Sequence, residues 1–214
     1  APMPAGVRAL RADLGDGQGL SALPRRPDAV VFCAAPDSRD EAAYRRLYLD
    51  GQRRLLDALA EVPARWIFVS STAVYGEDDG SWVDEETPAR PTGFNGRVLL
   101  EAEAVAGPAA IALRLTGLYG PGRDAMRRRA LTAEAARPHW TNRIHVDDAA
   151  AAASFLLDLA APPRCYLGVD DLPARECDVF DWLRARAGLP AAPRRMMMIA
   201  SSQMTLRLRP LWGR

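Results

Sequence analysis

Three consecutive hydroxyl side chains, Ser70, Ser71 and Thr72, directly follow an apolar run from Trp66 to Val69. The run is too short for an independent helix and is rich in β-forming residues, which predicts a strand buried on both faces. Ligands of open α/β sheets lie at the carboxyl ends of the strands, so these hydroxyls are candidates for binding or catalysis there. An equally good interpretation is that they only satisfy backbone groups where the strand ends.

The composition is that of an ordinary globular protein. The 214 residues carry a net charge of +1, with 49% hydrophobic and 26% charged residues, which allows one large domain with a sizeable core. The near-neutral charge argues against nucleic acid as a partner. No apolar run reaches the roughly 18 residues of a membrane span, and no leader pattern begins the chain. We therefore expect no membrane partner and a cytoplasmic location.

The cysteines and histidines do not indicate a metal site. Cys33, Cys165 and Cys177 are far apart and form no C-x-x-C pair, and His139 and His145 form no H-E-x-x-H motif. Such patterns are what zinc sites and disulfide frameworks require. We expect free thiols, a reducing compartment and no metal.

Strands and helices are predicted to alternate along the chain, which favours an α/β fold with a doubly wound, mostly parallel sheet. Ser38 to Glu41 has the form of a capping box, and Asp147 or Asp148 is expected to cap a later helix. The predicted strands are 6–14, 28–36, 66–69, 111–115 and 166–169, and the predicted helices are 20–23, 38–61, 94–106, 149–159 and 179–187. Segments 77–91, 116–122 and 123–138 are expected to be loops or turns.

Three segments resemble motifs of extended short-chain dehydrogenases, the NAD-dependent epimerase/dehydratase family. S-S-T-A-V-Y-G at 70–76 resembles the strand that carries the active-site serine or threonine. L-R-L-T-G-L-Y-G-P-G at 113–122 is similar to the family's L-R-x-x-x-x-Y-G-P-G, and H-V-D-D at 145–148 precedes a similar helix. The resemblance covers about Val7 to Leu189 and implies a Rossmann-like sheet, NAD or NADP as cofactor, and a small-molecule substrate.

The resemblance also implies roles for particular residues. Asp13 would bind the adenine amino group and Leu14 would cover the ring, while Ser71 would hold the reacting oxygen. Asn142 and Arg143 would line the substrate side. The residues implied to contact the cofactor are Asp13, Leu14, Cys33, Ala34, Ala35, Ser70, Arg97, Leu115, Thr116 and Leu118.

The usual catalytic tyrosine and lysine of the family are not at their expected places. Alignment of the predicted helix 94–106 puts Gly93 on the tyrosine and Arg97 on the lysine. Shifting the alignment by one residue puts Phe94 at the tyrosine position, and Phe94 has no ionisable proton. Arg97 can still bind ribose hydroxyls, although its own proton is effectively fixed. Tyr48, Tyr75 or Tyr119 are possible substitutes, and each is more simply interpreted as a packing residue.

The family's first strand and glycine-rich phosphate loop have no counterpart here. Gly15, Gly17 and Gly19 lack the sixth-position glycine of the dinucleotide motif, and Asp16 would place a negative charge against the pyrophosphate. We expect the missing elements to lie upstream of residue 1. We further predict an NAD(P)-binding domain over 1–160 and a small C-terminal substrate lobe over 161–214.

Two functions remain open. The protein is either an oxidoreductase or isomerase acting on a hydroxylated, sugar-like substrate, or a dinucleotide-sensing protein without turnover. The resemblance also implies a homodimer formed through helices 38–61 and 94–106. The segment after Arg194 has no clear period, and the sequence specifies neither the substrate nor the choice between NAD and NADP.

Overall fold

The computed structural model describes residues 5–77, 79–132, 135–194 and 207–208. Its centre is a four-stranded parallel sheet, which confirms the mostly parallel, Rossmann-like α/β fold that the sequence predicts. In space the strands run in the order β1 (Ala29–Phe32), β2 (Arg65–Ser71), β4 (Ala110–Leu115) and β8 (Cys165–Gly168). Parallel neighbours need crossover connections, and helices supply most of them here.

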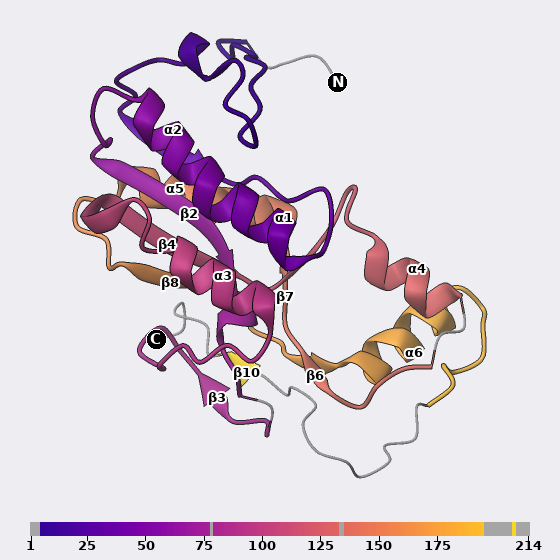
Figure 1. Cartoon of the computed structure of the whole chain (residues 1–214). Coiled ribbons are helices and arrows are strands. Elements are labelled where there is room, and N and C mark those ends of the chain that lie inside the picture. The colour runs from indigo at the N-terminus through magenta and orange to yellow at the C-terminus, as the bar shows by residue number, and fades with distance from the viewer. Residues whose placement is uncertain (1–4, 78, 133–134, 195–206, 209–214) are drawn as a thin grey trace.

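Helices cover both faces of this sheet (Figure 1). Successive residues of a strand point to opposite faces, so β2 contributes to two apolar layers. Trp66 and Phe68 belong to one cluster with Leu99, and Ile67 belongs to another with Leu156. The first face carries α1 (Glu41–Arg45), the π-helical segment η2 (Arg46–Gly51), α2 (Gln52–Ala58) and α3 (Phe94–Ala102), and the second carries α5 (Val146–Asp158).

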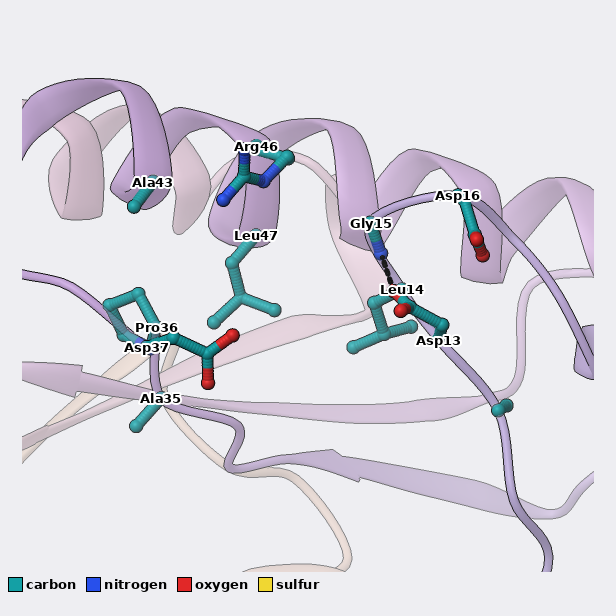
Figure 2. Close-up of a pocket in the computed structure, with 11 residues that line it drawn as sticks. Asp13, Leu14, Gly15, Asp16, Ala35, Pro36, Asp37, Ala43, Arg46 and Leu47 are labelled. Atoms are coloured by element: carbon teal, nitrogen blue, oxygen red, sulfur yellow. Dashed lines mark hydrogen bonds between the residues drawn. The ribbon is translucent and has the colours of Figure 1, made fainter.

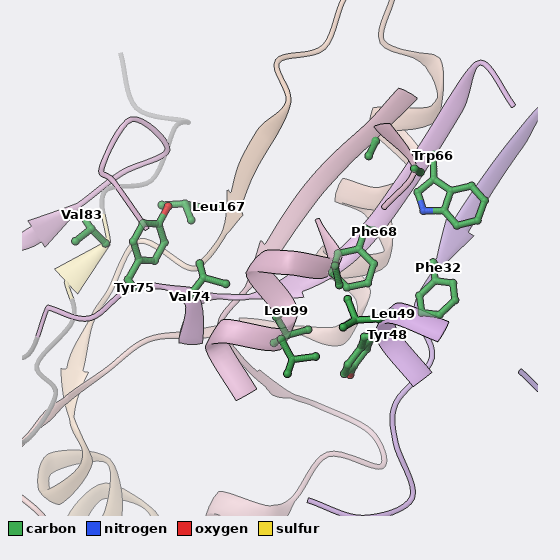
Figure 3. Packing of buried hydrophobic residues seen from close by; sticks show 14 of the residues in the cluster. Phe32, Tyr48, Leu49, Trp66, Phe68, Val74, Tyr75, Val83, Leu99 and Leu167 are labelled. Carbon is green, nitrogen blue, oxygen red and sulfur yellow. The ribbon is translucent and has the colours of Figure 1, made fainter. Parts of the chain in front are cut away.

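The larger apolar cluster extends along the whole of β2 and beyond its end (Figure 3). Phe32 stacks on Trp66 with ring centroids 6.4 Å apart, and Tyr48 meets Phe68 edge-on at 5.9 Å. Tyr75, just beyond the strand, is fully buried in the same cluster. The core therefore fixes the segment that carries the serines at both of its ends.

A smaller lobe lies apart from the sheet (Figure 1). Phe180 is fully buried at its centre and packs in a cluster of its own with Ala130. The lobe consists of α4 (Ala125–Leu131), β6 (Trp140–Thr141), β9 (Ala174–Arg175) and α6 (Glu176–Arg186), and a parallel pair, β5 (Gly117–Tyr119) and β7 (Arg143–His145), links it to the sheet. The lobe is therefore formed by two separate stretches of chain. β8 lies between them in the sequence but is a strand of the central sheet.

Short elements complete the described chain. η1 (Leu20–Ala22) agrees with the short helix predicted at 20–23. The others are η3 (Thr72–Val74), η4 (Gly107–Ala109), and β3 (Trp82–Val83), which pairs in parallel with β10 (Arg207–Leu208). The rest of the segment after Arg194 lies outside the described residues.

The strand predicted over residues 6–14 is wrong. The structure assigns these residues to no helix or strand, and Val7 is 53% exposed. A strand needs a hydrogen-bonded neighbour and buried alternate side chains, and within the described ranges this segment has neither. β1 also lacks a strand neighbour on one side, because among the described residues it pairs with β2 alone, and Val31 stays exposed.

The predicted capping box at Ser38 is also wrong. Helix α1 begins at Glu41, and its cap is Asp40, whose Oδ1 accepts a hydrogen bond from the Ala43 amide at 2.9 Å. Ser38 donates to the Asp40 carboxylate instead. Aspartate and serine are equally good caps, so the local spacing to the free amides decides between them.

The cap of α5 likewise differs from the prediction. His145 fills this role, because its Nδ1 accepts a hydrogen bond from the Asp147 amide at 3.3 Å. Asp147 and Asp148 lie in the first turn of the helix. Their charges are favourable there, where the helix dipole is positive, so they support the helix start without capping it.

Three segments predicted as loops or turns contain regular structure. Residues 123–138 include α4, which forms because Met126 and Ala130 pack against Phe180 of the remote helix α6. Residues 116–122 include β5, whose partner β7 is also remote in sequence, and residues 77–91 include β3. Each element depends on a partner that the local sequence does not reveal.

Candidate functional site

The carboxyl edge of the sheet carries the residue predicted to hold the reacting oxygen. β2 ends at Ser71, which the strand register places beside Leu115, the last residue of β4. The Ser71 Oγ accepts a hydrogen bond from the Ala73 amide at 3.2 Å and so caps the η3 turn. Ser71 is partly buried, and its hydroxyl proton remains available for donation to a ligand oxygen.

Ser70 points to the opposite face of β2 and is buried. Its Oγ donates a hydrogen bond to Glu103 Oε1 at 2.7 Å. Glu103 in turn accepts two hydrogen bonds from the Arg114 guanidinium. The structure therefore places Ser70 in an internal polar network, and its contact with a cofactor stays a prediction.

Helix α3 lies directly against the turn that follows Ser71. A Cβ built on Gly96 would come within 2.0 Å of the Ala73 carbonyl oxygen, so a residue other than glycine would force the two segments apart. The sequence reasoning missed Gly96, although a glycine inside a helix is itself a signal of close packing. This contact holds the start of α3 near the end of β2.

Arg97 and Gly93 are positioned by that start. Arg97 is exposed, and one Nη donates to the Thr92 carbonyl at 2.8 Å. Gly93 is the N-cap of α3 in extended backbone, with φ −94° and ψ 158°. A Cβ there would meet only the flexible Asn95 side chain, so the backbone does not require glycine at this position. A small side chain could therefore be accommodated at position 93 if the Asn95 side chain moved.

A cavity of about 460 Å³ opens beside the carboxyl end of β1 (Figure 2). Its walls come from the loop before η1, the segment after β1, and the helix formed by α1 and η2. The lining residues are Ala12, Asp13, Leu14, Gly15, Asp16, Ala35, Pro36, Asp37, Ala43, Arg46 and Leu47. Three of the predicted cofactor residues, Asp13, Leu14 and Ala35, therefore meet in one cavity, which we call the β1 cavity.

The β1 cavity has the chemistry of an adenosine site. Leu14 and Leu47 direct apolar side chains toward the gap from different walls, which suits a planar ring (Figure 2). Asp13 and Asp37 supply carboxylate acceptors for an amino group or for ribose hydroxyls. Asp13 Oδ1 also accepts the Gly15 amide at 2.6 Å, which fixes the loop. The residues present thus fit the adenosine part of a dinucleotide.

Leu14 reaches this position because η2 carries a glycine. A Cβ built on Gly51 would lie 3.1 Å from the Leu14 Cβ and 3.4 Å from its carbonyl oxygen. Arg54 adds a hydrogen bond to the same carbonyl at 3.1 Å. Gly51 therefore sets one wall of the β1 cavity, a role that the sequence alone does not predict.

The remaining predicted cofactor residues lie along the same edge but outside the β1 cavity. Cys33 is exposed, and Ala34 packs against the main core. Leu115 and Thr116 are buried, and Thr116 Oγ1 donates to the last carbonyl of β8 at 3.1 Å. Leu118 packs with the cluster under α5. Their contacts with a cofactor stay predictions.

Two of the three tyrosines considered as proton donors are core residues. Tyr48 and Tyr75 are buried, and burial raises the pKa of each hydroxyl to about 12. Tyr119 is 42% exposed, and its ring meets His145 edge-on at 5.2 Å. Of these three tyrosines, Tyr119 is the one that reaches solvent.

A second cavity, of about 600 Å³, lies in the lobe between α4 and α6 and is bounded by the ends of β5 and β7. Arg143 lines it, as the resemblance implies for the substrate side, and Asn142 does not. The lining residues are Tyr119, Gly120, Arg123, Asp124, Met126, Arg127, Arg143, Asp170, Leu172, Ala174, Asp178, Val179, Trp182 and Leu183. We call this the lobe cavity.

The sequence reasoning missed most of the lobe cavity. The one available signal is Trp182, which lies two residues from the buried Phe180 and hence on the opposite side of α6. A large apolar residue on the exposed face of an amphipathic helix is unusual and indicates a contact surface.

A parallel sheet with helices on both faces, and a cavity at its carboxyl edge that suits adenosine, defines a nucleotide-binding protein of the Rossmann-like class. The chain belongs to the NAD dependent epimerase/dehydratase family, whose model matches residues 2–167. This membership confirms the resemblance seen in the three sequence motifs.

Individual relatives agree with this assignment. Protein YeeZ of Escherichia coli K12 is 41% identical over 147 residues, which cover 66% of this chain and 52% of YeeZ, so the chain spans about half the length of that relative. A Methylobacillus flagellatus structure named as an NAD-dependent epimerase/dehydratase is 36% identical, with a TM-score of 0.77 over 97% of this chain and 76% of that one.

A more distant structure shares the fold. WbmG of Bordetella bronchiseptica in complex with NAD is 18% identical, with a TM-score of 0.78 over 97% of this chain and 71% of that one. Within the described ranges of our chain, no helix has the length and apolarity to cross a membrane. The same ranges contain no cluster of three or more His, Cys, Asp or Glu side chains arranged to hold a metal ion.

Proposed function

We propose that the protein binds NAD or NADP along the carboxyl edge of its sheet and acts as an oxidoreductase or isomerase on a hydroxylated, sugar-like small molecule. The observation that carries this proposal is the β1 cavity, in which Asp13, Leu14 and Ala35 meet. Family membership supports the cofactor class, and the register that pairs Ser71 with Leu115 supports a place for the reacting group.

Different residues of the chain would bind the cofactor and orient the substrate. Leu14 and Leu47 would hold the adenine ring, and Asp13 would accept a hydrogen bond from its amino group. Arg97 would donate to the ribose hydroxyls through its fork of N–H groups. The bound dinucleotide would supply a hydride donor or acceptor. Ser71 would donate a hydrogen bond to the reacting oxygen of the substrate and orient it.

Proton transfer needs a donor other than the usual tyrosine. General acid–base help is typically worth about 10²- to 10⁴-fold in rate, and Gly93 cannot supply it. Tyr48 and Tyr75 are buried core residues, so Tyr119 is the candidate that a substrate can reach. We infer that hydride transfer is slow or relies on Tyr119 together with Ser71.

The second candidate function is non-catalytic dinucleotide sensing. Two observations favour it. Gly93 has no acidic side chain at the usual place of the tyrosine, and Arg97 stands at the usual place of the lysine. Both residues still permit cofactor binding.

Calorimetry of the full-length protein with NAD and with NADP, each alone, tests the shared part of both functions. We expect saturable binding of at least one cofactor, weakened at least tenfold by Asp13→Asn. Asp57→Asn serves as the control, because Asp57 is exposed on α2 and does not line the β1 cavity. Absence of binding by the full-length protein would refute the proposal.

Turnover separates the two functions. The absorbance of reduced cofactor is followed with a panel of nucleotide sugars for the wild type, Ser71→Ala and Tyr119→Phe. Slow turnover that both variants reduce supports the enzyme, and cofactor binding without turnover supports the sensor. Robust turnover that survives both Ser71→Ala and Tyr119→Phe would show that the reacting group lies elsewhere.

We also infer a homodimer through helices 38–61 and 94–106. α1 and α3 are joined by an ion pair between Arg45 and Glu101 at 3.2 Å, with the side chains 48% and 46% exposed, so the two helices present one continuous surface. Light scattering at micromolar concentration tests this inference. A monomer would contradict it, and a dimer should weaken on Arg45→Glu.

A further inference from the structure

The lobe cavity is apolar inside, unlike the β1 cavity. Met126, Val179, Trp182 and Leu183 line it from α4 and α6, and Leu172 from the preceding loop. Trp182 and Leu172 are 57% and 73% exposed. Exposed large apolar side chains that gather in a concave site indicate a ligand with an apolar part.

Two arginines beside this apolar surface have no ion-pair partner within the described ranges. Arg123 precedes α4 and Arg127 lies on it, and both are exposed lining residues of the lobe cavity. The adjacent Arg128, by contrast, pairs with Asp124. Guanidinium groups bind carboxylates and phosphates through paired N–H donors, so the lobe cavity has a place for an anionic group.

The lobe cavity also contains an unsatisfied acceptor. Asp170 follows β8, and its Oδ1 is buried without a hydrogen-bond partner in the described part of the chain. Burial raises the pKa of this carboxyl, opposed by the charge of Arg143. A buried acceptor without a donor is unfavourable, and a ligand hydroxyl could donate the missing hydrogen bond to Asp170 Oδ1.

β5 leads from the reacting edge to the lobe cavity. Ser71 lies beside Leu115, Thr116 follows, and β5 then ends at Tyr119, which lines the cavity. Four extended residues span at most about 14 Å and neighbouring strands are about 5 Å apart, so the Cα atoms of Ser71 and Tyr119 lie within about 19 Å of each other. A ligand that spans the lobe cavity and Ser71 therefore has to bridge at most about 19 Å between these Cα positions.

We propose that the lobe cavity binds an amphipathic, hydroxylated acid. Its carboxylate or phosphate pairs with Arg127 and Arg123, its hydrocarbon or aromatic body packs against Trp182 and Leu183, and a hydroxyl donates to Asp170. The inference rests on the proposed function, because it specifies the substrate class of that site. It adds an apolar part and an anionic group to the hydroxylated substrate of that function.

Calorimetry of the full-length protein, with the preferred dinucleotide present, tests the proposal using three probes: 3-hydroxyoctanoate, octyl phosphate and UDP-glucose. We expect saturable binding of 3-hydroxyoctanoate or octyl phosphate, and the stronger of the two identifies the anionic group. Both should bind more tightly than UDP-glucose. Octanoate, which lacks the hydroxyl, should bind at least threefold more weakly than 3-hydroxyoctanoate.

Matched variants locate the probe. Arg127→Gln and Trp182→Ala should each weaken binding at least tenfold, and Asp170→Asn should remove the advantage of 3-hydroxyoctanoate over octanoate. Arg137→Gln is the control, because Arg137 is an exposed arginine between α4 and β6 and does not line the cavity. Arg127 and Trp182 are exposed, so their replacement should leave the fold intact.

Dinucleotide binding in the same preparation distinguishes failure of this inference from failure of the proposed function. If the dinucleotide binds and neither amphipathic probe does, or if Arg127→Gln binds them as the wild type does, the inference is overturned and the proposed function stands. Tighter binding of UDP-glucose than of either amphipathic probe overturns it as well. If no dinucleotide binds, the proposed function itself fails.

Discussion

Arg114 on β4 and Glu103 at the C-cap of α3 form a bidentate ion pair inside the protein. The guanidinium Nε and one Nη lie 2.9 and 2.7 Å from the two carboxylate oxygens, and the side chains are 9% and 10% exposed. Burial alone lowers the pKa of Arg114, but the hydrogen bonds and charge of Glu103 outweigh it and raise that pKa. The pair ties α3 to the strands that end at Ser71 and Leu115.

Breaking this pair should destabilise the protein strongly. Glu103→Gln leaves the Arg114 charge buried without a counter-charge, and such changes cost about 3–5 kcal/mol of unfolding free energy. Urea denaturation measures the loss. Glu101→Gln is the matched control, because its exposed pair with Arg45 should contribute less than about 1 kcal/mol. Equal losses in the two variants would contradict the argument.

Stability should fall in alkaline solution because of two buried tyrosines. Burial raises the pKa of Tyr48 and Tyr75 from 10.0 to about 12. Since the unfolded state loses these protons first, the stabilisation is complete below pH 10 and is lost as the pH rises through 12. Each hydroxyl contributes at most about 1.4 kcal/mol per pH unit.

Urea unfolding across this pH window measures that slope. Tyr48→Phe should reduce it, because the Tyr48 hydroxyl makes no hydrogen bond within the described residues and is lost without leaving an unpaired group. Tyr119→Phe is the control, since an exposed hydroxyl should leave the slope unchanged. A slope that Tyr48→Phe does not alter would show that other groups titrate.

The fold was predictable from the sequence where the signal was local. The apolar runs at Trp66–Val69 and Ile111–Leu115 predict buried strands, and β2 and β4 are the two central strands of the sheet. α4 and β5 were not predictable, because each is stabilised by a partner far along the chain. The strand expected at 6–14 is the opposite error, an element predicted but not formed. Its residues have some strand propensity, but no neighbouring strand pairs with them in the described part of the chain.

Gly96→Ala should move α3 away from the end of β2. The added Cβ meets the Ala73 carbonyl, and forced overpacking of this kind costs about 1–3 kcal/mol. We also expect weaker dinucleotide binding, because Arg97 moves with the helix. Gly93→Ala is the matched control, since its Cβ meets only the flexible Asn95 side chain. Urea denaturation and calorimetry of both variants measure the two effects.

A bound dinucleotide should protect Cys33 from alkylation. Cys33 is exposed just after β1, whereas Cys177 is buried and burial raises the pKa of the Cys165 thiol to about 11. Iodoacetamide at neutral pH should therefore modify Cys33 first, which mass spectrometry of peptides detects. Saturating NAD or NADP should slow that modification at least tenfold. An unchanged rate with the cofactor bound would place the dinucleotide away from β1.

The candidate site was only partly predictable. The family resemblance brought Asp13, Leu14 and Ala35 together, and the structure places all three in one cavity. Gly51 and Gly96 act through close approach of segments remote in sequence, and a glycine inside a helix signals close packing without revealing which segment packs there. Trp182 and Asp170 belong to the lobe cavity, whose walls form only when α4 packs on α6.

The separate apolar cluster of the lobe has an evolutionary consequence. Phe180 and Ala130 pack with one another and not with the sheet core, so substitutions near the lobe cavity should leave the sheet intact. Mutations in α4 and α6 can then accumulate and alter ligand selectivity while the dinucleotide side is conserved. We expect homologues to diverge most in residues 123–131 and 172–183, and new specificities to arise there by drift.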